Sequence, residues 1–536
     1  MVIQFDWKKC YKNTYCVLIL LFILVIAIYG RTLWGDFVFD DRGIVEHYNS
    51  LSNPLEIKEI FGMPYWTQDA GLYRPFTLYT YSLNYFFLGT SSFGFHFINL
   101  ILYWLICSSL FIFIKRLFNS KVFAFISALI FLVLPIHTEV VSNIIGRAEI
   151  MALLFSLFLL IEFTRKEISS WRVCLWLFLA ISSKETAIAV IPIAFMVAYF
   201  TDKERIGTLL KKYLFPTLSI LSASVLYFSL RLMVLGSELL IGVKTSMVEN
   251  PLIFSSATER ILTAFKVLSM YIGKSIVPVN LCSDYSYNQI PIVDNILNIE
   301  SFLGLIIFLG LIFSIFYFIN RQPVISLSSS FFFFAFLPIS NLLFPIGTIA
   351  GERLMFYPSV GIAMFISFIF LFTFHILKEK KVLYGKITII ILIAIFLIYS
   401  FVSIRRSGDW FSEKKLFTDA ALCAPNSTLS LSNMGTVYYF EGKYDEAEKK
   451  LLDSINIYDG YSKGLNNLGL VYWKKNNNKK ALEYYNKAIN TKYPYPGAYE
   501  NMALLYISEG NIEQARKWLR IFFSNDESLV NAYLRR

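Results

Sequence analysis

The stretch CVLILLFILVIAIYGRTLW, residues 16–34, indicates the fold class of the chain. It follows Lys8, Lys9 and Lys12. A helix needs about 20 apolar residues to cross a hydrocarbon core of about 30 Å. A cleaved signal peptide is disfavoured because the run is long for the hydrophobic region of a signal and no small-residue cleavage site follows it. The stretch therefore predicts a first membrane span, with residues 1–14 in the cytoplasm.

Nine further apolar regions predict a polytopic membrane protein, and one of them, broken at residues 182–185, is a hairpin of two shorter helices. Together with the first span they make eleven predicted crossings. The regions are Phe95–Ile114, Val122–His137, Ile150–Thr164, Trp171–Phe200, Tyr213–Leu235, Phe302–Ile319, Val324–Leu343, Leu354–Leu377 and Ile387–Ser403.

Composition and charge agree with this class of protein. The chain of 536 residues is 56% hydrophobic and 16% charged, whereas soluble domains carry about 25% charged residues. The net charge is +11, of which residues 406–536 hold 18 basic and 15 acidic residues. The remaining excess clusters at the ends of apolar runs, as the positive-inside bias requires, so nucleic acid is a poor partner.

The basic flanks fall on one side of the membrane only if Ile261–Val279 is a half-buried or re-entrant segment. Its interior Lys266 and Lys274 favour that interpretation. An odd number of spans then places the C-terminal part outside the cytoplasm. The expected division is a membrane domain over residues 15–405, with a first extracytoplasmic loop at 35–94, and a second domain over 406–536.

The six cysteines include no CxxC pair and no metal-ligand spacing. Four lie in or beside apolar segments, and Cys282 and Cys423 stand alone in their predicted loops. No disulfide framework is therefore expected.

The C-terminal domain repeats itself every 34 residues. Small, polar and aromatic positions recur in step, which is the signature of tetratricopeptide repeats. Three copies are predicted, at about 428–461, 462–495 and 496–529, with a degenerate half-repeat at Trp410–Pro425. Such arrays stack into a superhelix whose concave face commonly holds a peptide. The recurring residues are Asn433, Asn467 and Asn501, then Tyr438, Tyr472 and Tyr506, then Ala447, Ala481 and Ala515.

The segment FVFDDRG, residues 37–43, places Asp40 and Asp41 directly after the first span. One interpretation is a helix cap or a solvated pair in a loop. The other is a catalytic carboxylate at the mouth of a membrane cavity, because an ionised Asp accepts a proton from an attacking hydroxyl.

Two other segments on the predicted outer side carry paired charges. HTEVVSNIIGRAE (137–149) and GERLMFYPSVG (351–361) combine arginines with acidic neighbours. These pairs either neutralise each other or converge on a phosphate headgroup, for which the donor fork of Arg is suited. The residues concerned are His137, Glu139, Arg147, Glu149, Glu352 and Arg353.

Four more polar residues belong to the same face. Lys184 and Glu185 break the helix hairpin, and a structural ion pair is favoured over contact with a ligand. Arg74 in YRPFTLY and His96 in GFHFIN lie nearby, and His96 is interpreted as a packed interfacial residue. P-loop, HExxH and GxSxG motifs are absent from the sequence, so a nucleotide-driven pump or a metalloprotease has no support.

The order of these motifs resembles a known family. The acidic pair is followed by YRPFTLYTYSLNYFFLG, LPIHTEVVSNIIGRAE, SSKET, a P-x-x-L-C-x-DYS stretch at 278–286, GERLMFYPSVG and the repeats. This order is similar to that of the transmembrane and tetratricopeptide-repeat O-mannosyltransferases of animals and their bacterial relatives, in the GT-C superfamily. The array is shorter than in the animal proteins, so the identity of the acceptor does not carry over.

The resemblance implies an all-α fold: a GT-C membrane bundle of about eleven helices followed by a tetratricopeptide superhelix. It also implies an inverting transfer of a sugar, such as mannose, from a polyprenyl-phosphate carrier to Ser or Thr hydroxyls. Asp40 aligns with the catalytic base and Asp41 with its acidic neighbour. From side and charge, Arg147, Arg353, Arg74 and Lys184 are expected to bind the donor phosphate. The supporting residues are His137, Glu139, Glu149, Glu352, Glu185 and His96.

We expect no obligatory cofactor, because lipid phosphate is already a good leaving group, although the sequence does not rule out a divalent metal. The expected partners are the membrane lipid carrier and an acceptor protein held by the repeats. Residue usage typical of an AT-rich genome favours a bacterial inner membrane with the repeats outside, the endoplasmic reticulum being the alternative.

Three other functions compete with this interpretation. A GT-C enzyme acting on a glycan or lipid acceptor would use the repeats for assembly. A non-catalytic scaffold would present the repeats to partners and would not need Asp40. A transporter is disfavoured because the two halves show no inverted hydropathy repeat.

Overall fold

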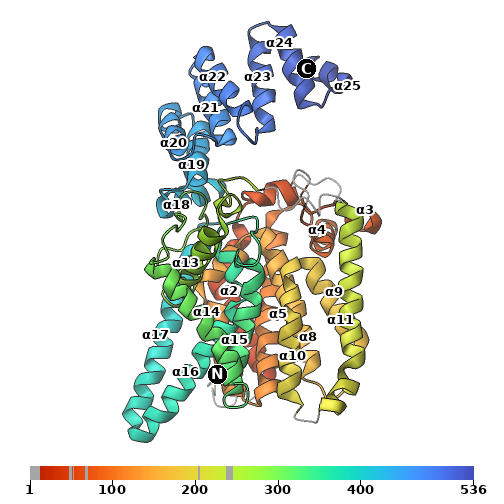
Figure 1. Cartoon of the computed structure of the whole chain (residues 1–536), viewed down its shortest axis with the longest axis vertical. Helices are drawn as coiled ribbons and strands as arrows, with labels where there is room; N and C mark the ends of the chain where they lie inside the picture. Colours follow the sequence, from red (N-terminus) through yellow and green to blue (C-terminus); the bar gives the residue numbers. More distant parts are fainter. Residues whose placement is uncertain are drawn as a thin grey trace, which may run out of the picture.

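The computed structural model describes residues 13–46, 51, 53–66, 71–202, 206–236 and 245–535. Most of the segment predicted to be cytoplasmic, residues 1–14, lies outside the described residues. The regular elements of the described residues are all helices, which confirms the predicted class. They form a membrane bundle with an array of short helices at one end (Figure 1).

Within the described residues, seven helices are long and apolar enough to cross a membrane. Their length follows from uninterrupted apolar runs, in which every backbone polar group is bonded within the helix. They are α2 (Thr14–Tyr29, continued by η1, Gly30–Trp34), α5 (Ser92–Phe118), α8 (Arg147–Phe163), α11 (Ile206–Leu235), α14 (Ile299–Tyr317), α16 (Ser359–Lys380) and α17 (Val382–Ser407).

An eighth candidate span is broken. Helix α6 (Lys121–Val133) is followed after a bend of 55° by a second short helical stretch. The bend falls at Pro135, which lacks an N–H and restricts the residue before it. The second stretch consists of η4 (Pro135–His137) and α7 (Thr138–Ser142).

Three shorter apolar helices complete the bundle. The predicted hairpin is broken where expected, at Lys184. The count of eleven is reached only when these three are also taken as spans, so helix length by itself supports seven or eight crossings. They are α9 (Ser170–Ser183), η6 with α10 (Glu185–Ala189 and Val190–Thr201), and α15 with η8 (Pro323–Phe336 and Leu337–Ile339).

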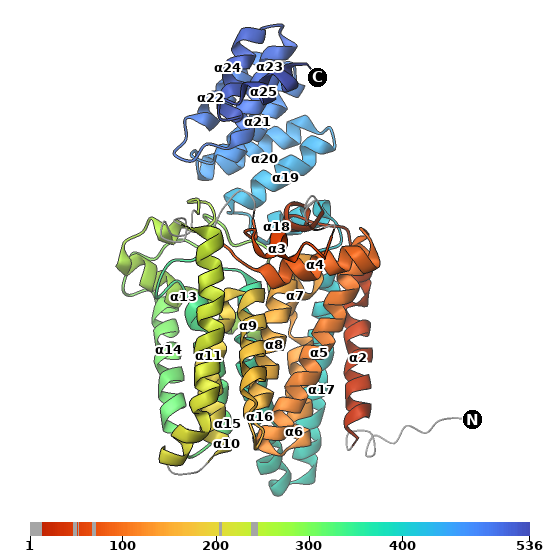
Figure 2. The same cartoon turned by 90° about the vertical axis from the view of Figure 1, so that its right-hand side faces the viewer.

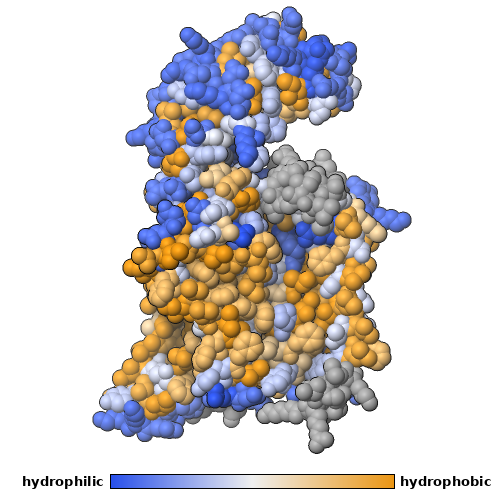
Figure 3. Space-filling view, viewed as in Figure 1, coloured by the Kyte–Doolittle hydropathy of each residue, from blue (hydrophilic) through white to orange (hydrophobic). Residues whose placement is uncertain are grey.

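The bundle has an apolar belt between two polar ends (Figure 3). At the end away from the repeats, Lys115 Nζ donates to Thr14 Oγ1 at 2.8 Å and Tyr199 donates to Asn320 Oδ1 at 2.8 Å. Lys115 is one of the basic residues expected to flank the spans on one side. We call the opposite end, which carries the repeats, the outer end (Figure 2).

The outer end consists of short helices and loops that pack over the bundle. Helix α13, whose amphipathic sequence suggested a half-buried segment, is not among the helices apolar enough to span. Its Lys266 pairs with Glu300 at 3.2 Å. The elements are η2 (Arg42–Glu46), α3 (Ile57–Phe61), α4 (Pro75–Leu88), η5 (Ile144–Gly146), η7 (Pro251–Ile253), α13 (Ala257–Ile276) and η9 (Glu352–Met355).

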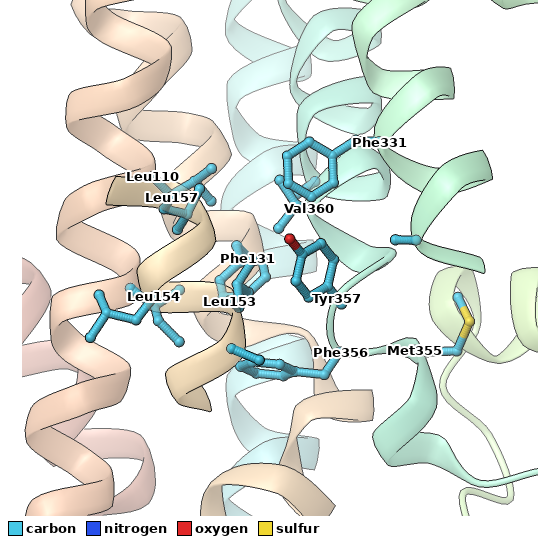
Figure 4. Packing of buried hydrophobic residues seen from close by; sticks show 14 of the residues in the cluster. Leu110, Phe131, Leu153, Leu154, Leu157, Phe331, Met355, Phe356, Tyr357 and Val360 are labelled. Atoms are coloured by element: carbon cyan, nitrogen blue, oxygen red, sulfur yellow. The ribbon is translucent and has the colours of Figure 1, made fainter. Parts of the chain in front are cut away.

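The core of the bundle closes directly beneath this end. Figure 4 shows Phe356 and Tyr357, just after η9, packed among side chains of α5, α6, α8, α15 and α16. The Phe356 ring lies 5.7 Å from that of Phe131, and the Tyr357 ring lies 5.8 Å from that of Phe331. The turn after η9 is therefore anchored in the core, which fixes the charged residues that precede it.

The repeat domain is a stack of helix pairs, as the 34-residue period predicted. Small residues allow the two helices of a pair to approach: a Cβ on Gly435 would meet Leu451 at 2.7 Å, and one on Gly469 would meet Tyr485 at 2.4 Å. Helix α18 (Glu413–Cys423) precedes the pairs α19 (Thr428–Phe440) with α20 (Tyr444–Ile457), α21 (Ser462–Lys474) with α22 (Asn478–Ile489), and α23 (Pro496–Ser508) with α24 (Ile512–Phe522); α25 (Glu527–Leu534) follows.

Although no disulfide framework was expected, the described residues contain a disulfide. Cys282, in the loop after α13, forms a disulfide with Cys423 at the end of α18, with Cα atoms 5.7 Å apart. The same loop receives the start of α19, where Ser430 donates to Asp284 at 2.6 Å and Thr428 N to Tyr287 O at 2.7 Å. The two cysteines are 141 residues apart, so spacing carried no signal for their pairing.

We predict that replacing both Cys282 and Cys423 by Ser lowers the stability of the outer end. Disulfides contribute roughly 2–4 kcal/mol, so the midpoint of thermal unfolding in detergent should fall by several degrees. Cys174→Ser, at a free and half-buried cysteine, is the matched control and should leave the midpoint unchanged. Ready alkylation of both thiols in the folded, non-reduced protein would contradict the pairing.

Candidate functional site

The segment 36–42 follows the first span and crosses the outer end beneath the repeats. Phe39 has a positive φ of 50°, a left-handed conformation that costs a residue with a Cβ about 1–2 kcal/mol. The turn at Phe39 directly precedes the two acidic residues. Asp41 is buried, whereas Asp40 is half-buried.

Asp41 holds the segment in place. Its Oδ2 accepts from Val38 N at 3.2 Å and its Oδ1 accepts from Ile145 N at 3.0 Å. Burial raises the pKa of Asp41 to about 7, against the lowering effect of these backbone donors. Both oxygens are therefore engaged: Oδ2 closes the turn within the segment, and Oδ1 joins the segment to η5.

Asp40 is in a different situation. In the part of the chain that the structure describes, no hydrogen bond or ion pair to its carboxylate is found. Burial raises its pKa to about 6; the charges of Arg353 and Lys463 lower it, and that of Glu249 raises it. A carboxylate with a raised pKa and no partner is a stronger base than an ordinary Asp.

A small cavity lies at the junction of the bundle and the outer end, and one of its lining residues, Arg353, is near enough to lower the pKa of Asp40. It has a charged side, formed by Glu149, Lys184 and Arg353, and an apolar side. Lys184 is paired with Glu149, and Arg353 Nη1 donates to Glu139 Oε1 at 3.0 Å. The remaining lining residues are Ala152, Thr186, Ala335, Ile339, Leu354 and Tyr357.

Both cations of the cavity keep hydrogen-bonding capacity for a ligand. The Arg353 side chain is 36% exposed and, among the described residues, only its Nη1 is bonded, so Nε and Nη2 remain available. Lys184 has three donors and gives one to Glu149. The cavity therefore offers three or more donors at the edge of an apolar pocket.

Arg74 and Glu185 form a separate pair. Arg74 donates to Glu185 through Nε at 3.0 Å and through Nη2 at 2.8 Å, and its guanidinium lies 4.9 Å from the centre of the Tyr65 ring. Neither residue is part of the cavity lining. The neighbours Lys184 and Glu185 thus each form an ion pair, with different partners.

Arg147 does not line the cavity either. It is fully buried and donates to Asn99 Oδ1 at 2.8 Å, Asn84 Oδ1 at 3.0 Å, Phe95 O at 2.9 Å and Thr80 O at 3.2 Å. These four acceptors leave it no route to a ligand. The geometry therefore does not favour the expected role of Arg147 in phosphate binding. Its side chain instead joins α8 to α4 and α5.

His137 and Glu352 also support the structure around the site. His137 is buried between Tyr103, at 2.9 Å, and Ser359, at 2.7 Å. Glu352, fully buried, accepts from Tyr285 at 2.8 Å and from Arg406 Nη2 at 2.9 Å.

His96 is buried beside Gly35, where a Cβ would meet its Nε2 at 3.3 Å. That agrees with the packed role expected for it.

Three residues that act on the site were missed. Glu249 and Lys463 influence Asp40 from distant parts of the chain, and Tyr357 lines the cavity. No local motif marks Lys463, which opens a repeat helix 423 residues after Asp40. Tyr357 belongs to the quoted GERLMFYPSVG segment, so only its contact with the cavity was missing. Among the described residues, no group of three or more His, Cys, Asp or Glu is placed to hold a metal.

The repeats match known protein families. Two family models, both described as tetratricopeptide repeat, match residues 426–492 and 496–520. A protein O-mannosyl-transferase of Caenorhabditis elegans is 28% identical over 456 residues, covering 83% of this chain and 63% of the worm protein. The human protein O-mannosyl-transferase TMTC3 is 26% identical over 470 residues, covering 81% of this chain and 50% of the human protein.

The chain thus spans between half and two thirds of the length of these two relatives. Among solved structures, an Archaeoglobus fulgidus oligosaccharyltransferase aligns over 82% of this chain and 59% of its own, with 16% identity and a TM-score of 0.36.

We predict that the two aspartates differ in their contribution to stability. Asp41→Ala leaves the N–H of the buried Val38 without its acceptor, at about 1–3 kcal/mol, and leaves Ile145 N with only Asn143 Oδ1 at 3.3 Å. Asp40→Ala removes a carboxylate with no hydrogen-bond donor and should change stability by less than about 1 kcal/mol. Thermal unfolding of the two variants in the same detergent measures the difference; equal losses would contradict it.

Proposed function

Because the chain is a distant homologue of the TMTC protein O-mannosyl-transferases with C-terminal tetratricopeptide repeats, we propose that it is a membrane glycosyltransferase. It moves a sugar from a polyprenyl-phosphate carrier to Ser or Thr hydroxyls of a protein. Mannose is the sugar favoured by the names of the relatives. The multi-pass membrane bundle gives a lipid-linked donor direct access from the bilayer.

The observation that carries this proposal is the state of Asp40. Its carboxylate is half-buried, has no hydrogen-bond partner among the described residues, and lies within the electrostatic reach of Arg353, which lines the cavity. A buried charge without a partner is expensive and needs a function to explain it. A general base beside a cation-lined pocket is such a function.

The donor phosphate is proposed to lie against Lys184 and Arg353. These are the two cations of the cavity, and both retain free donors. The apolar side of the cavity, including Ile339 and Leu354, suits the first carbons of a polyprenyl chain. Arg74 and Arg147, which donate to partners within the protein, keep the surrounding helices in place.

The reaction is a single displacement at the anomeric carbon. The acceptor hydroxyl oxygen forms the new bond to this carbon while Asp40 takes the hydroxyl proton. The bond from the anomeric carbon to the phosphate oxygen breaks, and its electron pair leaves on polyprenyl phosphate. Lys184 and Arg353 stabilise the negative charge that develops on the phosphate. The configuration is inverted because attack and departure occur on opposite faces.

The acceptor is proposed to be a protein segment presented by the repeats. The array stands over the outer end of the bundle (Figures 1 and 2). Lys463 of α21 is near enough for its charge to lower the pKa of Asp40. A superhelix of this type commonly holds an extended peptide. A bound segment would therefore have a short path to the base.

We place the repeats outside the cytoplasm, with eleven crossings if the three short apolar helices also span. The Cys282–Cys423 disulfide lies at the outer end, and disulfides persist in oxidising compartments. Basic residues such as Lys115 lie at the other end, as the positive-inside bias favours. The proposed location is a bacterial inner membrane, the endoplasmic reticulum being the alternative. No cofactor beyond the lipid-linked sugar is proposed.

The test uses the full-length protein in detergent with radiolabelled polyprenyl-phosphate mannose and a pool of Ser/Thr-rich peptides. Wild type should label the peptides, and Asp40→Asn should lose at least 100-fold in rate because the amide cannot accept the proton. Asp36→Asn is the matched control, since Asp36 is an exposed aspartate of the same segment and should keep full activity.

Each outcome distinguishes a class of function. Label in lipid or glycan but not in peptide would overturn the protein acceptor and favour the alternative GT-C reaction. Absence of transfer and of carrier binding by correctly folded wild type would overturn the enzyme and leave the scaffold.

The pH dependence gives an independent check on the base. Asp40 acts as the carboxylate, and burial raises its pKa to about 6. We therefore expect kcat/KM to fall about tenfold per pH unit below pH 6 and to level off above it. A limb near pH 4, the range of an ordinary Asp, would mean that the base is not the half-buried Asp40 described above.

A further inference from the structure

The first helix of the soluble domain packs directly on the segment that carries Asp40. The ring of Phe417, in α18, meets the ring of Phe39 edge-to-face with centroids 5.8 Å apart. Val38 is buried in the same contact, 1% exposed. The other buried members of this cluster are Trp410, Leu416, Phe417, Met434 and Val437.

Polar contacts hold both ends of the segment to the same helix and its approach. Asp36 N donates to Phe411 O at 3.0 Å. Arg42 Nε pairs with Glu413 Oε2 at 3.4 Å. Residues 411–417 therefore contact the segment 36–42 at three places: before Phe39, at Phe39 itself and after it.

The contact at Phe39 affects the orientation of the next residue, Asp40. Phe39 has a positive φ, a backbone conformation that residues other than glycine adopt only when their surroundings favour it. Its turn sets the direction of the next residue, Asp40. The ring of Phe417 is one of the contacts that keep Phe39 in this conformation.

We propose, on the basis of the function proposed above, that Phe417 is a positioning residue for Asp40. Its contact with Phe39 maintains the turn that sets the position of Asp40. The repeat domain thereby completes the catalytic site, in addition to any part it plays in holding the acceptor.

The far end of α18 is fixed to the opposite side of the site. Cys423 is bonded to Cys282, and the backbone N–H of Cys282 donates to Glu352, the neighbour of Arg353. One rigid helix thus connects the segment of the base to the loop of the phosphate-binding arginine. A contact at Phe417 therefore sets the placement of Asp40 relative to the donor site.

The test is Phe417→Ala in the full-length protein, assayed by mannose transfer from polyprenyl-phosphate mannose. We expect kcat to fall at least tenfold while KM for the donor changes less than twofold, because the donor site stays intact. Phe417→Leu, which keeps apolar volume against Phe39, should recover most of kcat. Leu422→Ala, on the same helix at a side chain that is 75% exposed, is the matched control and should behave as wild type.

The pH profile gives a readout that simple loss of folded protein does not move. Asp40 faces Arg353, Glu249, Lys463 and its neighbour Asp41, none of which changes in Phe417→Ala. Loss of the ring admits water, so the pKa of Asp40 should fall and the acid limb of kcat/KM should move to lower pH by at least half a unit.

A second variant protects the test against misfolding of the first. Phe39→Ala removes the contact from the other side and should give the same loss of kcat. The double variant should lose no more than the worse single variant, because both remove one contact.

Wild-type kcat and an unmoved acid limb in the two single variants, or additive losses in the double, would overturn the positioning role. Failure of wild type itself to transfer sugar would instead overturn the proposed function.

Discussion

The outer end of this protein depends on the carboxylate of Glu352, which is fully buried and joins three parts of the chain. It accepts from Tyr285 and from the backbone of Cys282 in the loop after α13, and it pairs with Arg406 at the end of α17. A buried carboxylate with these partners is strongly stabilised, whereas loss of one partner would leave an uncompensated charge. The last span, the loop and η9 are therefore held in one arrangement, and Arg353 follows Glu352 directly into the cavity.

The same rule of pairing explains why one charge stands out. Lys184 has Glu149, Arg74 has Glu185, and Arg147 has neutral acceptors on every side. Among the Asp, Glu, Lys and Arg residues expected to form the site, Asp40 alone has no partner within the described residues. The unpaired carboxylate of Asp40 is thus what marks the candidate site, because the charged residues around it are already paired.

The sequence predicted those features that depend on local periodicity. Long apolar runs predicted the spans, and the recurrence of residues such as Asn433 and Asn467 predicted the repeats, which the structure and the family models confirm. Features set by contacts between distant residues were out of reach. The different roles of Asp40 and Asp41 depend on Ile145 N. Helix length supports seven or eight of the eleven predicted crossings, because the three short apolar helices of the bundle fall below the length that marks a span.

The disulfide between Cys282 and Cys423 has a consequence for the order in which the protein is made. The loop of Cys282 is synthesised 141 residues before its partner, and the four apolar helices α14, α15, α16 and α17 lie between them. The outer end cannot be covalently closed until all of these helices have been inserted and Cys423 has reached the same side of the membrane. An incompletely inserted chain therefore lacks the closed outer end, and maturation of the site is tied to completed membrane insertion.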